Sequence, residues 1–164
     1  MRRRQWLFLV FGVAVSHASA LEDPGKNKIS RIAVQVYYAT NGNPASAGER
    51  GEKVSPEVEA RFRNVKSLRF KHYRMLGEDI QPLLRSYDSW AQPLQPSDEI
   101  MVRMEAAGVP SAKDTRLDLE LWLARKKTVK MDVHLKGGCP LLVLGPEWRG
   151  GRLIVSVALA PEGK

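Results

Sequence analysis

Hydrophobic and polar residues alternate most regularly in the second half of the chain. Leucines occupy every second position of residues 117–123, and the same alternation returns over residues 129–135 with Val, Met, Val and Leu. Alternation with period two is typical of strands with one buried face, and the short basic link at residues 125–127 indicates a turn. The two runs therefore predict an antiparallel hairpin with one solvent-exposed face. The eight apolar positions of this hairpin are predicted to form the centre of the hydrophobic core.

Alternating or continuous apolar runs predict further strands. They cover residues 29–40, 68–76, 80–84, 99–105, 140–144 and 153–159. Pro82 confines the short third run to an edge or a bend, because proline cannot donate to a strand ladder. The stretches between them predict a flexible loop at residues 41–53, a loop or irregular strand at residues 87–96, and turns at residues 106–114 and 145–151.

One helix is predicted after the first loop. Ser55 can cap a free backbone N–H, Pro56 fits the first helical position, and Glu57 faces the positive end of the helix dipole. Apolar residues from Val58 to Val65 then recur on one face. The fold class is therefore predicted to be α+β, mainly antiparallel β as a sandwich or open barrel, with one amphipathic helix near the N-terminus of the mature domain.

The N-terminal residues 1–20 read as a cleavable secretory signal peptide. Three arginines precede an apolar core over residues 6–15, and Ala18-Ser19-Ala20 supplies the small-x-small pattern before cleavage. The alternative is a buried N-terminal helix. Cleavage after Ala20 leaves a flexible lead at residues 21–28 and a single domain at residues 29–160. The protein is predicted to be exported, periplasmic or secreted, by the general or the twin-arginine route, with no membrane span after cleavage.

Charge and cysteine usage narrow the possibilities only slightly. The chain has 26 Lys and Arg against 18 Asp and Glu, and loss of the three signal-peptide arginines leaves a charge of about +5. This charge favours anionic partners such as envelope polymers or lipid headgroups, although solubility alone also accounts for it. Cys139 is the only cysteine, so an internal disulfide is excluded. Its place at the mouth of an apolar strand predicts a buried filler rather than a reactive thiol.

Two separated motifs suggest a family. The first is Phe70-x-x-Tyr73-Arg74-x-Leu76, and the second is Leu135-x-Gly137-Gly138-x-x-Leu141-x-x-x-Gly145-Pro146-x-x-x-Gly150-Gly151-x-Leu153-Ile154. Over residues 31–160 the chain resembles a group of small exported bacterial β-rich proteins of unknown function. The resemblance implies a signal peptide, a first strand ending in a variable loop, one helix and a β-rich half. It implies no activity and no catalytic residue.

Motifs for catalysis, metals and cofactors are absent from the sequence. It contains no phosphate-binding loop, dinucleotide fingerprint, nucleophile elbow or zinc-protease motif. Asp132 and His134 share a strand face and could touch a metal, but a solvated face explains them better. No catalytic residue, metal or cofactor is therefore predicted, and the protein is predicted not to be an enzyme. The rival interpretation is a small periplasmic enzyme whose unrecognised site contains His72, His134 or Cys139.

Aromatic and basic residues are the remaining candidates for binding. The predicted binding residues are Trp122, Trp148, Trp90, Arg125, Lys126, Lys127 and Lys130; a further basic group contains Lys66, Arg69, Lys71 and Arg74. Structural roles compete with this interpretation, because tryptophans cap core ends and lysines protect edge strands. The leading hypothesis is a non-enzymatic envelope protein, a β-rich binding or assembly module that works by surface contact, with an envelope protein or an anionic or sugar polymer as its partner. A polyanion- or carbohydrate-binding domain is the alternative, and export disfavours nucleic acid.

Overall fold

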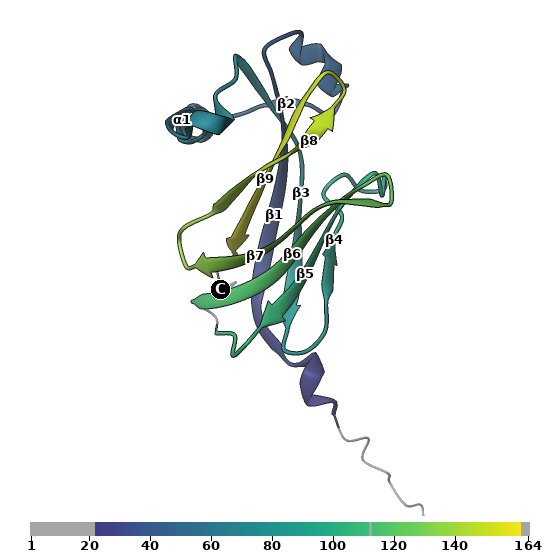
Figure 1. Cartoon of the computed structure of the whole chain (residues 1–164), viewed down its shortest axis with the longest axis vertical. Coiled ribbons are helices and arrows are strands. Elements are labelled where there is room, and N and C mark those ends of the chain that lie inside the picture. Colours follow the sequence, from purple (N-terminus) through teal and green to yellow (C-terminus); the bar gives the residue numbers. More distant parts are fainter. Residues whose placement is uncertain (1–21, 112, 162–164) are drawn as a thin grey trace, which may run out of the picture.

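The computed structural model describes residues 22–111 and 113–161, which form two antiparallel sheets (Figure 1). Their strands are β1 (Lys28–Thr40), β2 (Glu52–Lys53), β3 (His72–Leu84), β4 (Ser89–Ala91), β5 (Ile100–Ala107), β6 (Asp114–Leu123), β7 (Lys126–Lys136), β8 (Leu141–Trp148) and β9 (Gly151–Leu159). The first sheet has the order β2-β3-β1-β9-β8, and the second has the order β4-β5-β6-β7. The helix α1 (Pro56–Asn64) and the short 3-10 turns η1 (Pro24–Lys26), η2 (Pro44–Ala47) and η3 (Lys66–Leu68) complete the described part.

The main core lies between the two sheets. Its fully buried side chains include Val34 and Val36 of β1, Val102 of β5 and Leu117 of β6. Both sheets thus contribute one apolar face to the same cluster, which makes the molecule a sandwich rather than a closed barrel. The prediction of a mainly antiparallel α+β fold with one helix is confirmed.

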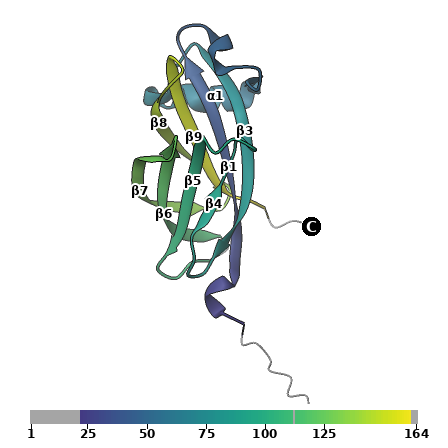
Figure 2. The ribbon, with the colours of Figure 1, turned by 90° about the vertical axis from the view of Figure 1, so that its right-hand side faces the viewer.

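A second apolar cluster lies on the outer face of the five-stranded sheet, beneath α1. Phe62 of the helix is its centre, with ring centroids 4.9 Å from Tyr37 and 5.3 Å from Tyr73. Ser55 caps α1 by accepting a hydrogen bond from the Val58 amide, as the sequence predicts. In both views α1 lies toward the end of the sandwich opposite η1 (Figures 1 and 2).

The strand predicted over residues 68–76 is wrong in its first half. Residues Lys66–Leu68 form η3, and β3 begins only at His72. The Tyr73 hydroxyl donates to the Leu68 carbonyl and accepts from the Phe70 amide, both at 2.8 Å, which holds this segment in a turn. From His72, β3 runs unbroken through Pro82. At Pro82 the strand pairs with β1 on one side only, because β2 pairs with β3 solely at Arg74 and Met75.

The C-terminal hairpin is longer than the sequence suggests. Residues 145–148, predicted as part of a turn, continue β8, so Trp148 ends a strand and is buried. Cys139 is exposed rather than buried, because it lies in the connection before β8 begins. The predicted apolar helix face also ends early: Val65 is the C-cap of α1 and is 40% exposed.

The β6–β7 hairpin is confirmed, although its two halves are buried to different degrees. The β6 leucines at 117, 119 and 121 are core residues, whereas Val129, Met131 and Val133 are only half-buried because β7 is an edge strand. The turn between them places Ala124 and Arg125 at φ values of 48° and 64°, a left-handed conformation that side chains disfavour.

Contacts with the preceding loop hold this turn in place. The Ala124 amide donates to the Glu99 carbonyl at 2.7 Å, and the Arg125 guanidinium contacts Asp98 at 3.0 Å.

The predicted signal peptide lies outside the described residues. In the predicted lead, η1 is a 3-10 turn capped by Asp23, and in the predicted loop at residues 41–53 the chain forms η2 and β2. Within residues 22–111 and 113–161, no helix has the length and apolar character needed to cross a membrane.

Candidate functional site

The outer face of the four-stranded sheet carries a grid of aromatic and charged side chains. Strand pairing places Met101, Trp122 and Lys127 side by side, and Arg103, Glu120 and Lys130 beside them. Side chains alternate along a strand, so these residues point away from the core leucines of β6. We call the group Trp90, Arg103, Glu120, Trp122, Lys127 and Lys130 the tryptophan face.

Two tryptophans from different strands meet on this face. The rings of Trp90 and Trp122 have centroids 5.6 Å apart and are tilted by 59°. Each indole N–H donates to a carboxylate, Trp90 to Asp88 at 3.0 Å and Trp122 to Glu120 at 2.9 Å. Trp90 remains 39% exposed. The pair therefore offers aromatic surface in a fixed orientation.

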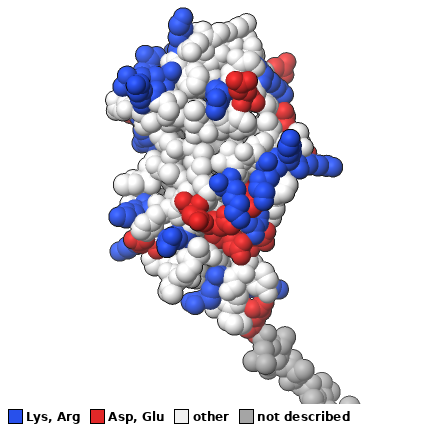
Figure 3. All heavy atoms as spheres, in the orientation of Figure 1, with Lys and Arg blue, Asp and Glu red and all other residues white. Residues whose placement is uncertain are grey.

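An ion-pair network surrounds the two tryptophans. Arg103 contacts Asp88 at 3.0 Å, Glu120 at 3.8 Å and also Glu105. Glu120 is 4% exposed and receives the Lys127 ammonium at 3.0 Å. Its carboxylate therefore lies between cations from the two neighbouring strands, β5 and β7. Figure 3 shows acidic and basic side chains interspersed over this sheet.

Lys130 extends the network along β7. Its ammonium lies 3.0 Å from Asp118 and 3.8 Å from Glu120. Each cation of the tryptophan face thus has at least one carboxylate within contact distance.

Three members of the ion-pair network have pKa values shifted in the direction that keeps them charged. The hydrogen bond from Lys127 lowers the pKa of Glu120, and the hydrogen bond from Arg103 lowers the pKa of Asp88. The hydrogen bond to Asp118 raises the pKa of Lys130. These three shifts favour the charged forms of Glu120, Asp88 and Lys130.

The structure brings together four of the seven predicted binding residues. Trp90, Trp122, Lys127 and Lys130 meet on the tryptophan face. Arg125 lies in the hairpin turn, where it pairs with Asp98, and Lys126 follows as the first residue of β7. Trp148 lies apart from them, on β8 of the other sheet.

Sequence reasoning missed Arg103 and Glu120. Both occupy polar positions of predicted alternating strands, which placed them on an outer face. Their pairing depends on which strands are neighbours in the sheet, and alternation within one strand does not contain that information.

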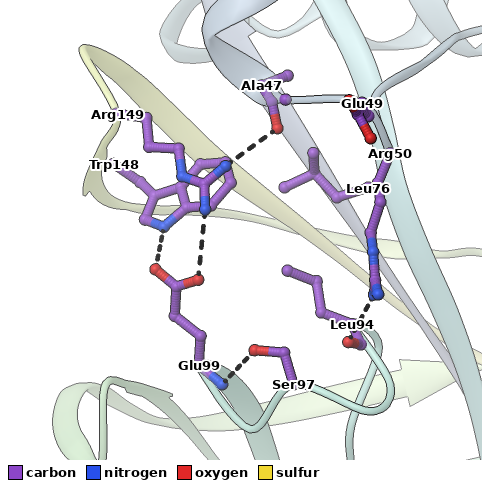
Figure 4. Close-up of a pocket in the computed structure, with 10 residues that line it drawn as sticks. Ala47, Glu49, Arg50, Leu76, Leu94, Ser97, Glu99, Trp148 and Arg149 are labelled. Carbon is purple, nitrogen blue, oxygen red and sulfur yellow. Dashed lines mark hydrogen bonds and ion pairs between the residues drawn. The ribbon is translucent and has the colours of Figure 1, made fainter.

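Trp148 instead helps to line a pocket of about 290 Å³ at one end of the sandwich (Figure 4). Its indole N–H donates to Glu99 at 2.8 Å, and the Arg149 guanidinium lies 4.2 Å above its ring. Leu76 and Leu94 form an apolar wall across the pocket from Trp148, and Arg50 on the same side as these leucines donates to the Leu94 carbonyl at 3.0 Å (Figure 4).

The polar groups around this pocket bind one another. Arg149 lies 3.7 Å from Glu99 and donates to the Ala47 carbonyl at 3.4 Å, while Tyr38 donates to the Arg149 carbonyl at 3.0 Å. These contacts join three segments that are distant in sequence, namely those at Ala47, Glu99 and Arg149. The pocket has space for a small apolar group, and its polar contacts fasten the end of the sandwich.

The residues of the enzyme hypothesis have no metal-holding arrangement in the described part of the chain. His134 pairs with Asp114 on the neighbouring strand, and no group of three or more His, Cys, Asp or Glu there is placed to hold a metal ion.

Comparison with known proteins adds no further information on the site: the chain matches no protein-family model, no curated protein and no solved structure. The functional interpretation therefore depends on the geometry described above.

Proposed function

We propose that the protein is an exported, non-enzymatic binding module that docks onto a protein partner of the cell envelope through the tryptophan face. The observation that carries this proposal is the Trp90–Trp122 pair, which is accessible and is held in place by indole hydrogen bonds to Asp88 and Glu120. Tryptophan and arginine are the residues that most often dominate the energetics of protein interfaces.

Pre-organisation favours docking at this face. A side chain that is already fixed loses little conformational entropy on binding, and each immobilised side chain otherwise costs roughly 0.5–1.5 kcal/mol. The indole hydrogen bonds fix both tryptophans before any partner arrives. The surrounding charges of both signs supply the polar rim that sets orientation and partner choice.

The same geometry disfavours a polyanion or a sugar as the ligand of this face. A polyanion would have to displace Asp118 and Glu120 from the lysines of β7. A sugar ring stacks on an open aromatic face, but Trp122 has Trp90 against it and the Lys127 ammonium 5.6 Å from its ring centroid. A protein partner can instead pack against the edges of the pair and align its own charges with the network.

Site-specific photo-cross-linking in the native envelope tests the proposal. A photoreactive amino acid replaces Met101, the half-buried neighbour of Trp122 on β5, in one variant and Ile80, which is 39% exposed on β3 of the other sheet, in another. We expect one recurrent protein adduct from position 101 and none from position 80. The substitution Trp122→Ala should weaken that adduct at least tenfold, since interface tryptophans commonly contribute about 2 kcal/mol or more.

Two results would overturn docking at this face. One is the same set of adducts from both positions, which would mean non-specific contact. The other is no protein adduct from position 101 in a protein that is exported and folded, as judged by circular dichroism. A separate failure of export would contradict the predicted destination and leave the docking face to be tested with purified envelope proteins.

A further inference from the structure

A second surface of the molecule carries cations without the carboxylates that accompany the tryptophan face. Six Lys and Arg residues, and no Asp or Glu, occur between Glu59 and Glu78. They are Arg61, Arg63, Lys66, Arg69, Lys71 and Arg74. We call residues 61–74 the basic segment. It runs from the last turn of α1 through η3 to the start of β3.

Few of these cations have an anionic partner. In the described part of the chain only Arg63 of the six forms an ion pair, with Glu59 of the same helix. Arg69 donates to the Arg63 carbonyl and Arg74 to the Tyr73 carbonyl, so both bind neutral oxygens. Arg61, Lys66 and Lys71 are exposed. The positive charge of this segment is therefore available to an external anion.

The fold holds the basic segment in one place. Phe62 and Tyr73 pack against each other beneath it, and Phe70 lies 6.5 Å from Tyr73, ring centroid to centroid. The Tyr73 hydroxyl binds backbone groups of Leu68 and Phe70. Basic side chains gather over α1, toward one end of the sandwich (Figure 3). A cluster near an extremity can meet a flat surface with several side chains at once.

An apolar side chain lies among these cations. Val65, at the C-cap of α1, is 40% exposed between Arg63 and Lys66. Cations that surround an exposed aliphatic residue match the interface of an anionic bilayer, where phosphates lie beside the outermost acyl carbons. A soluble polyanion matches the cations and leaves the valine without a partner.

We propose that the basic segment docks the protein onto the anionic lipid headgroups of a bilayer surface. The tryptophan face has charges of both signs and lies on a different sheet, so it remains free for a protein partner. The proposal is independent of the docking function assigned to that face, because no residue is shared between the two surfaces.

Sedimentation with vesicles of equal parts phosphatidylglycerol and phosphatidylcholine tests the proposal. The test variant is Arg61→Gln/Lys66→Gln/Lys71→Gln, whose three side chains make no hydrogen bond or ion pair within the described residues. The control is Arg116→Gln/Lys126→Gln/Lys136→Gln, which removes the same charge from exposed positions of the β6–β7 hairpin whose side chains also make no hydrogen bond or ion pair within the described residues. A cation near an anionic surface strengthens binding by about fivefold, so the test variant should bind roughly 100-fold more weakly.

The control variant should bind like the unaltered protein, and binding should weaken as salt is added. Equal losses in the two variants would overturn the proposal, because net charge alone would then explain binding. No binding of the unaltered protein at low salt would overturn it as well.

A second variant separates a bilayer from a soluble polyanion. Val65→Ser should weaken vesicle binding by about threefold and leave binding of inorganic polyphosphate unchanged. If the protein binds polyphosphate as tightly as vesicles and Val65→Ser affects neither, the surface is a general polyanion site and the proposed lipid surface is wrong.

Discussion

The basic segment and the β6–β7 hairpin each contain several basic residues, but the surroundings of these residues differ. Both place several Lys and Arg close together in sequence. In the hairpin, Lys127 forms an ion pair with Glu120, and Lys130 forms one with Asp118; both carboxylates lie on the adjacent strand β6. Arg125 forms an ion pair with Asp98 of a loop. The basic segment pairs across the sheet with the opposite strand only from His72 onward, and its single carboxylate partner comes from its own helix.

The difference shows that the residues packed around a run of basic side chains decide whether its charges are paired or remain available to a ligand. Cross-strand pairing converts the hairpin cations into parts of a structural network that fixes two tryptophans. A helix end and a turn provide no such opposite strand, so their cations face solvent. This difference is the reason that we propose a specific protein contact for the first surface and an anionic bilayer for the second.

Removal of the support beneath the basic segment should have the largest effect. Phe62 is buried and packs on Tyr37 and Tyr73, so Phe62→Ala should lower the free energy of unfolding by about 3–5 kcal/mol. Urea unfolding measures this loss. Val65→Ala, three residues further along at an exposed position, is the matched control and should change stability by less than about 0.5 kcal/mol. A loss below about 1 kcal/mol for Phe62→Ala would mean that the aromatic cluster does not hold the segment.

Acid should weaken the hairpin network, with a smaller effect than the loss of Phe62. Lys127 lowers the pKa of Glu120 below its ordinary value of 4.5. A carboxyl whose pKa is lower in the folded state stabilises the protein above the unfolded pKa, and this contribution is lost as pH falls through the folded pKa. Glu120→Gln should therefore reduce stability at neutral pH, and the difference from the unaltered protein should shrink below about pH 4.5.

Thermal unfolding at neutral pH and near pH 3 measures this convergence. Glu147→Gln is the control, because Glu147 is an exposed carboxylate without an ion pair in the described part of the chain. A constant difference between Glu120→Gln and the unaltered protein at both pH values would contradict the role assigned to the carboxylate of Glu120.

The fold class was predictable because burial of one face imposes period two on each strand. Residues 117–123 and 129–135 pair as the alternation requires, and Ser55 caps the helix where its hydroxyl predicts. The wrong predictions concern segments whose backbone conformation is set by contacts that the local apolar pattern does not show. Tyr73 holds residues 68–70 in a turn despite their apolar pattern, and residues 145–148 remain in β8 although glycine and proline indicate a turn.

The candidate site was predictable only in its exposed parts. The sequence marks Trp90 and Trp122 as candidate binding residues, but these residues lie on two strands that are separated by β5 in the sheet. The sequence pattern does not indicate which strands are neighbours in the sheet. The contacts of Trp90 with Trp122 and of Arg103 with Glu120 could therefore be found only in the structure. Trp148 shares only its residue type with Trp90 and Trp122, because it is buried at the end of β8 in the other sheet.

The most direct test of the difference between the two basic regions is the reactivity of individual lysines toward a small acylating reagent, read by peptide mass spectrometry on the native protein. Lys127 and Lys130 have side chains that are 44% and 55% exposed, so ion pairing rather than burial should govern their rates. We expect Lys127 and Lys130 to react severalfold more slowly than Lys66 and Lys71, and Asp118→Asn/Glu120→Gln to remove that difference. Equal rates for all four lysines, unchanged by the double variant, would contradict the division between a paired and an unpaired basic surface.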